Sequence, residues 1–426
     1  MKVTVNRLSK KTEEPRLTRL RYEPEHDKYI LAYSDEDNPR VAEPSEVGVL
    51  ANSAIRPNSA PAGALSAPIV AQIAVTRDCN LTCKFCYAEL SKYQTDFQMS
   101  TDQVKTVIDQ LHEQGVVHLE WAGGEPLMRD DFIELMCYAH ALDFKQAVIT
   151  NATHFSDEYL KQGLKCLRSV QVSIDDIGEH YDNLKGGPWF EILKKNIRRG
   201  LAAGLPMIAS NVITDYNVER LEDIVHFIWE IGFKRARICW QIPLGDAKDQ
   251  SLDEYRDLVS RTVKRARALQ REYVEKGLQI FCVQEKDGEE MVGAEFLPRE
   301  YLLCSAGRTR LHIDWNGDAY ACPLLKYDEL KAGNVIETST ADAWKSMSFD
   351  SIREVKNGEA CTSCQLYCGY WCRAITYGFT RDMGMTPSPV CHHEWKNPST
   401  SSKARETPEN EPLKEEVIHV PIVVNP

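Results

Sequence analysis

The chain has 426 residues, of which 43% are hydrophobic and 27% are charged, and its formal net charge is −12. This length suits one enlarged α/β barrel with an appendage, and the composition is that of a globular protein. Because the chain is acidic and has no long basic run, we do not expect it to bind nucleic acid. Because no apolar run of about 18 uncharged residues is present and residues 1–11 lack the apolar stretch of a signal peptide, we expect a cytoplasmic protein without a membrane span.

Residues 1–67 are predicted to form an N-terminal appendage. Residues 28–33 (KYILAY) have the composition of a strand, and a turn is predicted at residues 35–39. Residues 52–68 are rich in Ala, Pro, Ser and Asn, which is typical of a linker or an irregular loop.

Residues 68–300 are predicted to alternate between strands and helices. The expected strands are residues 69–75, 117–121, 146–150, 169–174, 207–213 and 235–241, and helical patterns between them include residues 100–114 and 218–231. Six such units predict parallel strands, either in an open (β/α)6 barrel or in a doubly wound sheet. A long amphipathic helix is expected at residues 251–276, with Ser251 and Glu254 as its capping box.

The C-terminal part of the chain is predicted to be a separate cysteine-rich domain at residues 301–395. Helical periodicity fades there, and seven of the 14 cysteines lie in it. Residues 396–426 are polar and proline-rich, so we expect them to be largely disordered.

Cys79, Cys83 and Cys86 follow the first barrel strand, with three residues and then two between them. In a cytoplasmic protein, an excess of cysteine favours metal or cluster ligation over disulfides. A structural zinc site would need a fourth ligand, whereas three thiolates suit a [4Fe–4S] cluster with one open iron. An open iron can chelate the amino and carboxylate groups of a methionine, which would place a sulfonium against the cluster for one-electron cleavage.

The spacing of these cysteines resembles the CxxxCxΦC signature of the radical S-adenosylmethionine (SAM) superfamily. Phe85 occupies the aromatic Φ position, and Tyr87 follows the last cysteine, as is common in that family. The resemblance implies a partial (β/α)6 barrel that binds SAM and a [4Fe–4S] cluster.

A second stretch, Gly123-Gly124-Glu125-Pro126, follows the second predicted strand and resembles the GGEP motif of the same family. The resemblance implies that these residues contact SAM. Glycines would let the backbone approach the ligand, and Glu125 would accept a hydrogen bond from the methionine ammonium group.

Polar residues at the ends of later strands complete the implied SAM site. Asn151 follows the third strand, Ser173 and Asp175 end the fourth, and Asn211 lies on the fifth. The resemblance places Ser173 and Asp175 near the SAM ribose and the methionine carboxylate. These positions lie at C-terminal strand ends, where barrel active sites assemble, although capping of the strand ends would also explain them.

The second cysteine array resembles the SPASM extension of radical SAM enzymes, which carries auxiliary iron–sulfur clusters. Its members are Cys304, Cys322, Cys361, Cys364, Cys368, Cys372 and Cys391. Three residues separate Cys364 from Cys368, where the family pattern has five. A zinc ribbon is the alternative, but seven thiolates fit two clusters better than they fit zinc.

Carried over by position, the resemblance assigns four cysteines to an outer auxiliary cluster: Cys361, Cys364, Cys368 and Cys391. It assigns three to an inner cluster: Cys304, Cys322 and Cys372. The inner cluster is then one protein ligand short, which implies either an open iron facing the substrate or a ligand other than cysteine.

Four further cysteines, Cys137, Cys166, Cys239 and Cys282, are interpreted as small buried hydrophobic residues. Cys239 lies on the sixth strand, and Cys282 precedes the cysteine-rich domain. Either of these two could instead act as a hydrogen-atom donor in catalysis or complete the inner cluster.

The resemblance implies a maturase that modifies a ribosomally synthesised peptide by cross-linking, thioether formation, epimerisation or backbone excision. The 5′-deoxyadenosyl radical would remove a hydrogen atom from an unactivated carbon, which ordinary side chains cannot do. An anaerobic sulfatase-maturing enzyme and a tetrapyrrole side-chain decarboxylase are the alternative enzymes. An iron–sulfur scaffold or electron carrier is the alternative without catalysis.

The expected partners are a precursor peptide and a reductant such as flavodoxin or ferredoxin. Many peptide-modifying relatives carry a leader-binding winged-helix domain of roughly 80 residues. The appendage offers one convincing strand and no clear helical run, and leader binding by strand addition needs an intact sheet. We therefore expect a separate leader-binding partner protein.

Overall fold

A computed structural model of the chain describes residues 17–23, 28–34, 39–47, 54, 64–88, 97–244, 249–282, 304–355 and 372–383. The chain divides into two compact units, Met1–Val390 and Cys391–Pro426, and all the described residues belong to the first. Most of the predicted turn and linker in the appendage, the predicted tail, and Cys361, Cys364, Cys368 and Cys391 lie outside the described residues.

The centre of the first unit is a nine-stranded sheet with the strand order β10-β9-β8-β7-β6-β5-β4-β11-β12. All six predicted barrel strands are present and parallel: β4 (Val70–Ala74), β5 (His118–Ala122), β6 (Lys145–Thr150), β7 (Leu167–Ser173), β8 (Met207–Ile213) and β9 (Arg235–Trp240). A seventh parallel strand, β10 (Gln279–Cys282), pairs with β9 and was not predicted. The prediction of a partial α/β barrel is therefore confirmed.

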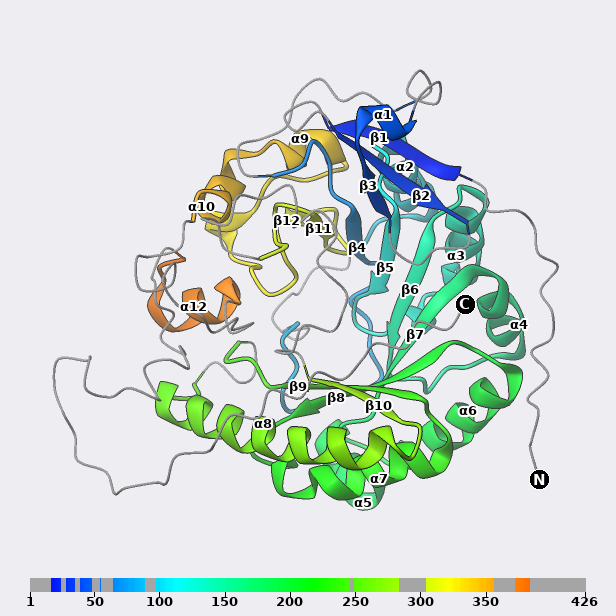
Figure 1. Ribbon diagram of the computed structural model, residues 1–426, viewed down its shortest axis with the longest axis vertical. Helices are drawn as coiled ribbons and strands as arrows, with labels where there is room; N and C mark the ends of the chain where they lie inside the picture. Colours follow the sequence, from blue (N-terminus) through cyan, green and yellow to red (C-terminus); the bar gives the residue numbers. More distant parts are fainter. Residues whose placement is uncertain are drawn as a thin grey trace, which may run out of the picture. The chain divides into compact units, whose positions relative to one another are not determined.

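Helices cover the outer face of this curved sheet (Figure 1). They are α2 (Thr101–Glu113), α3 (Phe132–Ala141), α4 (Asp157–Cys166), α5 (Gly178–Lys185), α6 (Phe190–Ala203), α7 (Leu221–Ile231) and α8 (Leu252–Val274). The predicted capping box begins α8, since Ser251 accepts from the backbone N–H of Glu254 and the Glu254 carboxylate accepts from that of Ser251. Among the described residues, no helix combines the length and apolar character that crossing a membrane requires.

The N-terminal appendage contains a three-stranded antiparallel sheet: β1 (Leu17–Glu23), β2 (Lys28–Tyr33) and β3 (Arg40–Ala42), followed by the short helix α1 (Pro44–Val47). Only β2 was predicted, so the expectation of a single strand was wrong. Strand β1 was not predicted because it contains charged residues. Two of them, Arg21 and Glu23, are fully buried as an ion pair of 2.6 Å. Arg21 also donates to the carbonyl groups of Ala67 and Pro68 at 3.0 Å, which fixes the appendage to the start of the barrel.

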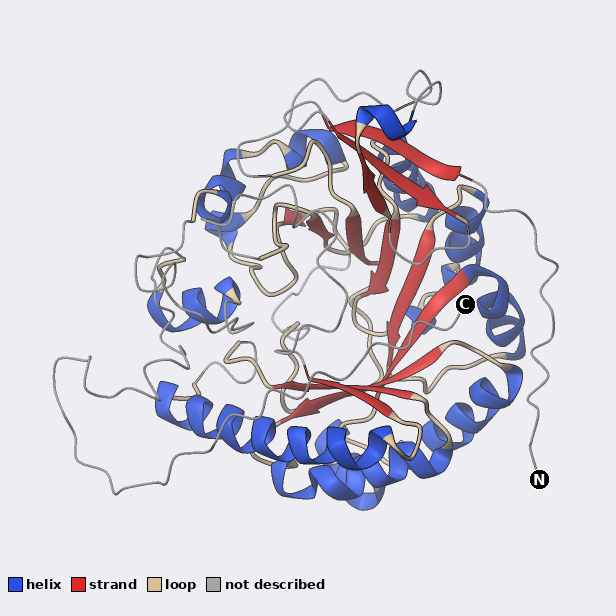
Figure 2. Cartoon of the chain, in the orientation of Figure 1, coloured by secondary structure: helices blue, strands red, loops and turns tan. Residues whose placement is uncertain are grey.

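The cysteine-rich region continues the barrel sheet. Its strand β11 (Arg310–Ile313) pairs in parallel with β4, and β12 (Ala319–Tyr320) pairs antiparallel with β11. The helical segments that follow are short: η6 (Asp328–Leu330), α9 (Thr340–Trp344), η7 (Met347–Phe349), α10 (Asp350–Arg353) and α12 (Arg373–Thr380). Figure 2 shows β11 and β12 at the edge of the sheet, surrounded mostly by loops and short helices. This pairing brings the segment between Cys304 and Cys322 next to the first barrel strand.

Candidate active site

The loop after β4 carries Cys79, Cys83 and Cys86, all of them half-buried. The loop is tightly turned, with the backbone N–H of Cys86 donating to the Cys83 carbonyl at 3.2 Å and that of Leu81 lying 3.5 Å from the Cys79 sulfur. Burial raises the pKa of Cys79 to about 11, and the charges of Glu125, Cys83 and Cys86 contribute to the rise. A thiol whose ionised form is disfavoured in this way suits a cationic iron centre, which would hold it as a thiolate.

Gly123 and Gly124 join this loop to the end of β5. The backbone N–H of Gly124 donates to the Thr76 carbonyl at 2.7 Å, and the next backbone N–H, of Glu125, donates to the Asp78 carbonyl at 2.7 Å. A Cβ atom on Gly123 would collide with the Thr76 carbonyl oxygen, and one on Gly124 with that of Asp78. The two glycines therefore let the cysteine loop approach the end of β5 closely, and their contact with the ligand stays a prediction.

Replacing Gly124 by alanine is expected to displace the cysteine loop. Because its new Cβ would meet backbone atoms of Arg77 and Asp78 that cannot rotate away, we expect SAM cleavage to fall about a hundredfold, as misplacements of 1 Å do. 5′-Deoxyadenosine formation and iron content would be measured. Gly163→Ala is the control, since its Cβ would contact only Leu205 and Leu167 side chains. Wild-type iron content and turnover in Gly124→Ala would contradict this account.

The other side of the cysteine loop is held by the C-terminal end of α5. The backbone N–H of Thr82 donates to the Lys185 carbonyl at 3.1 Å, and that of Lys84 donates to the Leu184 carbonyl at 3.3 Å. Gly186 ends the helix with φ of +77°, and a Cβ there would collide with the Thr82 side chain. Two glycine-containing turns thus hold the loop between them.

Lys185 is a buried residue of this site that the sequence did not reveal. Its ammonium group pairs with Asp175, and it lies 4.8 Å from the centre of the Phe85 ring. Burial lowers the pKa of Lys185, but the charges of Asp175 and Cys83 raise it by more. The net pKa therefore lies above the ordinary value for lysine. The second oxygen of Asp175 accepts the backbone N–H of Val212 at 2.5 Å, so this predicted SAM contact is engaged with protein groups on both sides.

The Glu125 carboxylate is also surrounded by donors. It accepts the Thr150 hydroxyl and the backbone N–H of Asn151, both at 2.7 Å, and that of Leu127 at 3.2 Å. Burial nevertheless raises the pKa of Glu125 to about 7. A cation placed beside Glu125 would favour its ionised form, which is what binding of an ammonium group would provide.

Asn151 lies between the third strand and the cysteine loop. Its amide nitrogen donates to the Asn80 side chain at 3.0 Å and lies 4.0 Å from the Cys79 sulfur, and its oxygen accepts the backbone N–H of Thr153. These contacts are the end-of-strand capping that was weighed as the alternative. They also place Asn151 directly beside the first predicted cluster ligand.

Asn211 and Ser173 lie on adjacent strands, β8 and β7. The Asn211 side chain is fully buried, its nitrogen donates to the Ile174 carbonyl, and its oxygen has no hydrogen-bond partner in the described structure. Ser173 is half-buried at the end of β7. The unsatisfied Asn211 oxygen leaves one acceptor available at the end of the barrel where the cysteine loop lies.

The candidate hydrogen-atom donors, Cys239 and Cys282, lie on β9 and β10. The Cys239 thiol donates to the backbone carbonyl of Asn211 at 3.1 Å, and burial raises its pKa to about 11. Cys282 is 2% exposed at the end of β10. Cys137 and Cys166, with sulfurs 4.0 Å apart, belong to α3 and α4 outside the sheet.

Three cysteines of the second array lie close together next to β11 and β12. Burial raises the pKa of Cys322, and the charges of Cys372 and Cys304 raise it further. Burial also raises the pKa of Cys372 to about 11, with Cys304 again contributing. Cys304 and Cys372 are thus near enough to Cys322 for their charges to act on it, and the assignment of the three to an inner cluster stays a prediction.

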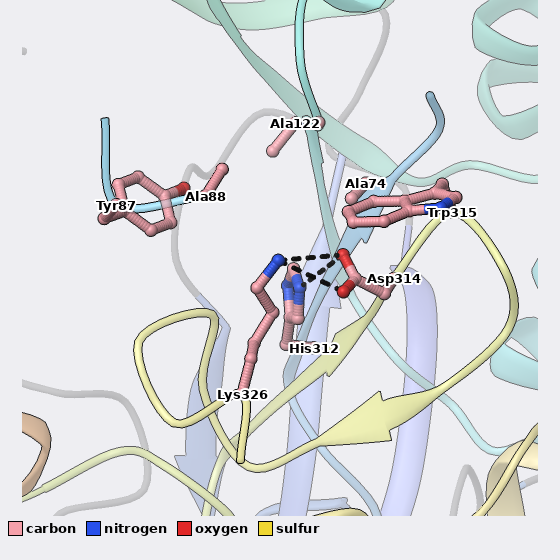
Figure 3. Close-up of a pocket in the computed structure, with 9 residues that line it drawn as sticks. Ala74, Tyr87, Ala88, Ala122, His312, Asp314, Trp315 and Lys326 are labelled. Carbon is pink, nitrogen blue, oxygen red and sulfur yellow. Dashed lines mark hydrogen bonds and ion pairs between the residues drawn. The ribbon is translucent and has the colours of Figure 1, made fainter. Parts of the chain in front are cut away.

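A small pocket lies beside the first cysteine loop, under the ends of β4 and β5 (Figure 3). It is lined by Ala74, Tyr87, Ala88, Ala122, Gly123, His312, Asp314, Trp315 and Lys326. Desolvation, and then the charges of Cys86, Cys322 and Asp314, raise the pKa of Tyr87. Tyr87 is thus close to both cysteine sets, and the pocket lies where the barrel and the cysteine-rich region meet.

Comparisons with known proteins agree with this arrangement. The sequence pattern of the Radical SAM superfamily matches residues 73–228, and that of the SPASM iron–sulfur cluster-binding domain matches residues 304–365. The mycofactocin maturase MftC of Mycolicibacterium smegmatis is 30% identical over 342 residues, which cover 79% of this chain and 85% of that protein. The AdoMet-dependent heme synthase of Nitratidesulfovibrio vulgaris is 28% identical over 348 residues, covering 75% and 91%.

Among solved structures, Streptococcus suis SuiB bound to its precursor peptide SuiA matches with a TM-score of 0.56 and 20% identity, over 72% of this chain and 70% of that one. This likeness supports the fold. Taken with the two domain matches and the relative that is 30% identical over most of both chains, it leads to one conclusion: the chain is an enzyme of the radical SAM superfamily that carries a SPASM iron–sulfur cluster-binding domain.

Proposed function

We propose that this enzyme is a maturase that uses a 5′-deoxyadenosyl radical to modify a ribosomally synthesised peptide. The observation that carries the proposal is the pocket in which Tyr87 is near both Cys86 of the first cysteine loop and Cys322 of the second array. A substrate there would lie between a radical source and an electron acceptor. The maturase named among the relatives, and the solved relative with a precursor peptide, support a peptide as that substrate.

In this proposal, Cys79, Cys83 and Cys86 hold the [4Fe–4S] cluster of the radical SAM domain. With SAM bound, the cluster supplies the radical that removes a hydrogen atom from the substrate. The protein's own contribution is to orient SAM: Glu125 would face the methionine ammonium group, and the free Asn211 oxygen would accept a hydrogen bond from SAM. Ser173 would lie near the ribose. Asp175 would act indirectly, through its ion pair with Lys185.

We assign the inner auxiliary cluster to Cys304, Cys322 and Cys372, and the outer one to Cys361, Cys364, Cys368 and Cys391. Removing Cys322 is expected to leave SAM cleavage intact and to abolish product formation, because Cys322 belongs to a different loop from the first cysteine set. Iron analysis should give about twelve irons per wild-type chain if three [4Fe–4S] clusters form.

The Cys322→Ala experiment compares iron content, 5′-deoxyadenosine formed without substrate, and product formed with substrate. Cys166→Ala, on the outer helix α4, is the control. Full product formation by Cys322→Ala would contradict the assignment. About four irons per wild-type chain, with zinc present, would favour a zinc ribbon in place of the auxiliary clusters.

The second candidate is a tetrapyrrole side-chain decarboxylase, which the heme synthase relative favours. The deciding experiment incubates the reconstituted enzyme with SAM, a reductant and either a candidate precursor peptide or a tetrapyrrole with carboxylate side chains. The proposal expects a change in peptide mass: loss of two hydrogens for a cross-link, loss of a residue-sized mass for excision, or no change with an inverted centre for epimerisation. Loss of carbon dioxide from the tetrapyrrole, with the peptide unchanged, would overturn it.

We propose that the leader of the peptide is bound with the help of a separate protein, and that flavodoxin or ferredoxin supplies the electron. A separate protein was expected because only one strand was predicted in the appendage, whereas the structure has three strands there. The described helix that accompanies them, α1, is only four residues long. The test measures binding of the precursor peptide to the enzyme alone and to the enzyme with the companion protein. Tight leader-specific binding by the enzyme alone would show that no separate partner is needed.

A further inference from the structure

His312, which lines the pocket, belongs to a row of polar side chains that crosses three strands. His312 on β11 is in register with Gln72 on β4, which is in register with Glu120 on β5. All three therefore point to the same face of the sheet. Arg310, two residues before His312, points the same way and donates both terminal nitrogens to Glu120 at 2.5 and 2.9 Å.

This row determines which nitrogen of His312 carries a hydrogen. Burial raises the pKa of Glu120, but Arg310 lowers it more, so the carboxylate is ionised and can only accept. The Gln72 amide nitrogen donates to Glu120 at 3.1 Å, which turns the Gln72 oxygen toward Nδ1 of His312, 3.0 Å away. Since an amide oxygen only accepts, Nδ1 must be the donor.

The other nitrogen, Nε2, is left as an acceptor that faces the pocket. His312 is 3% exposed, and Nε2 has no hydrogen-bond partner in the described structure. Oδ1 of Asp314 lies 3.4 Å from Nε2, which is longer than an ordinary N–H···O hydrogen bond. Lys326 holds Asp314 by its other oxygen at 3.1 Å. Figure 3 shows the three side chains converging below Tyr87 and Ala88.

Nε2 of His312 and Oδ1 of Asp314 are thus two buried acceptors with no hydrogen between them. A proton taken up between them would give both a hydrogen-bond partner. The charges around His312 keep it neutral until then: burial, Lys326 and Arg310 lower its pKa, and Asp314 only partly opposes them. Once a proton arrives on Nε2, the Asp314 carboxylate would stabilise the imidazolium.

We propose that His312 accepts the proton that the substrate loses when its radical is oxidised, and that Asp314, held in place by Lys326, stabilises the imidazolium that results. This inference rests on the proposed function and names its substrate class: a carbon bonded to an atom that carries a removable hydrogen (O–H, N–H, S–H or C–H). The carbon radical and its neighbour form a new double bond as the neighbour–hydrogen bond breaks. One electron goes to an oxidised auxiliary iron–sulfur cluster, and the proton goes to Nε2.

The test uses the reconstituted holoenzyme and two variants, His312→Asn and His312→Gln. The asparagine amide can still donate to Gln72 from the position of Nδ1 but has no atom at Nε2. We expect both variants to keep wild-type iron content. Product formed per 5′-deoxyadenosine should fall about a hundredfold, which is a typical contribution of a general base. His226→Asn, on α7 outside the barrel, is the control.

A second readout does not depend on the substrate. In holoenzyme labelled with ¹⁵N-histidine and with oxidised clusters, the signals missing from His312→Asn identify His312. We expect Nδ1 protonated and Nε2 unprotonated at neutral pH, and a lower His312 pKa in Asp314→Asn. A proton on Nε2 at neutral pH, or an unchanged product ratio in both variants, would overturn the proposal. If the wild type modifies no peptide, the proposed function fails, while the nitrogen signals still decide the state of His312.

Discussion

The Cys83→Ala variant is expected to form no detectable 5′-deoxyadenosine. Its thiol is the middle one of three on a single loop, and the side chains on which its charge acts include Lys185 and Tyr181, neither of which is a thiolate that could replace it. A cluster held by two thiolates lacks the ligands that a [4Fe–4S] centre with one open iron requires. SAM cleavage, which needs that iron, should disappear completely.

The measurement is chromatography of 5′-deoxyadenosine after anaerobic reconstitution and reduction, with iron content determined on the same sample. Cys137→Ala is the matched control, since this half-buried cysteine lies on α3, outside the sheet. The control should retain wild-type turnover. Normal 5′-deoxyadenosine formation by Cys83→Ala, with its iron content restored, would show that the loop is not the cluster site.

The Lys185→Met variant should lose about 3–5 kcal/mol of unfolding free energy, the usual cost of removing one partner from a buried ion pair. Lys185 and Asp175 are 2% and 1% exposed, so the substitution leaves a carboxylate buried without its cation. The thioether chain fills a similar volume, which isolates the charge from packing. Because the lysine also lies over the Phe85 ring, the variant should bind iron less well.

The midpoint of urea unfolding would be compared with that of Lys194→Met, whose partly exposed pair with Glu191 should contribute no more than about 1 kcal/mol. The double variant Lys185→Met/Asp175→Asn removes both charges and should recover part of the loss. Equal midpoints for Lys185→Met and Lys194→Met would show that the buried pair is not a structural requirement.

The sequence predicted the barrel well, because its strands are apolar runs separated by helices with clear periodicity. It failed where polar residues are buried. Strand β1 was missed because Arg21 and Glu23 look like surface residues, although each satisfies the other inside the protein. Strand β11 was missed because its arginine and histidine face the barrel interior, where Glu120 and Gln72 on other strands receive them.

In the candidate site, too, the sequence revealed some residues and missed others. Motif spacing located the cysteines, the glycine turn and Glu125, since these residues are close in sequence. Lys185 was missed because its partner, Asp175, lies outside the helix that carries it, and His312 was missed because its partner, Gln72, lies on a strand that is distant in sequence. No local pattern marks such residues. The reason for the two glycines was also beyond the sequence, because it depends on how closely two separate loops approach.

Transfer of deuterium from the substrate tests the central claim most directly. The reconstituted enzyme would be given SAM, a reductant and a precursor peptide that carries deuterium at the carbon to be modified, and the mass of the 5′-deoxyadenosine would be measured. The account predicts that one deuterium enters 5′-deoxyadenosine for each peptide modified, and that the transfer disappears in Cys83→Ala. Unlabelled 5′-deoxyadenosine, formed in the same amount with and without the peptide, would contradict it.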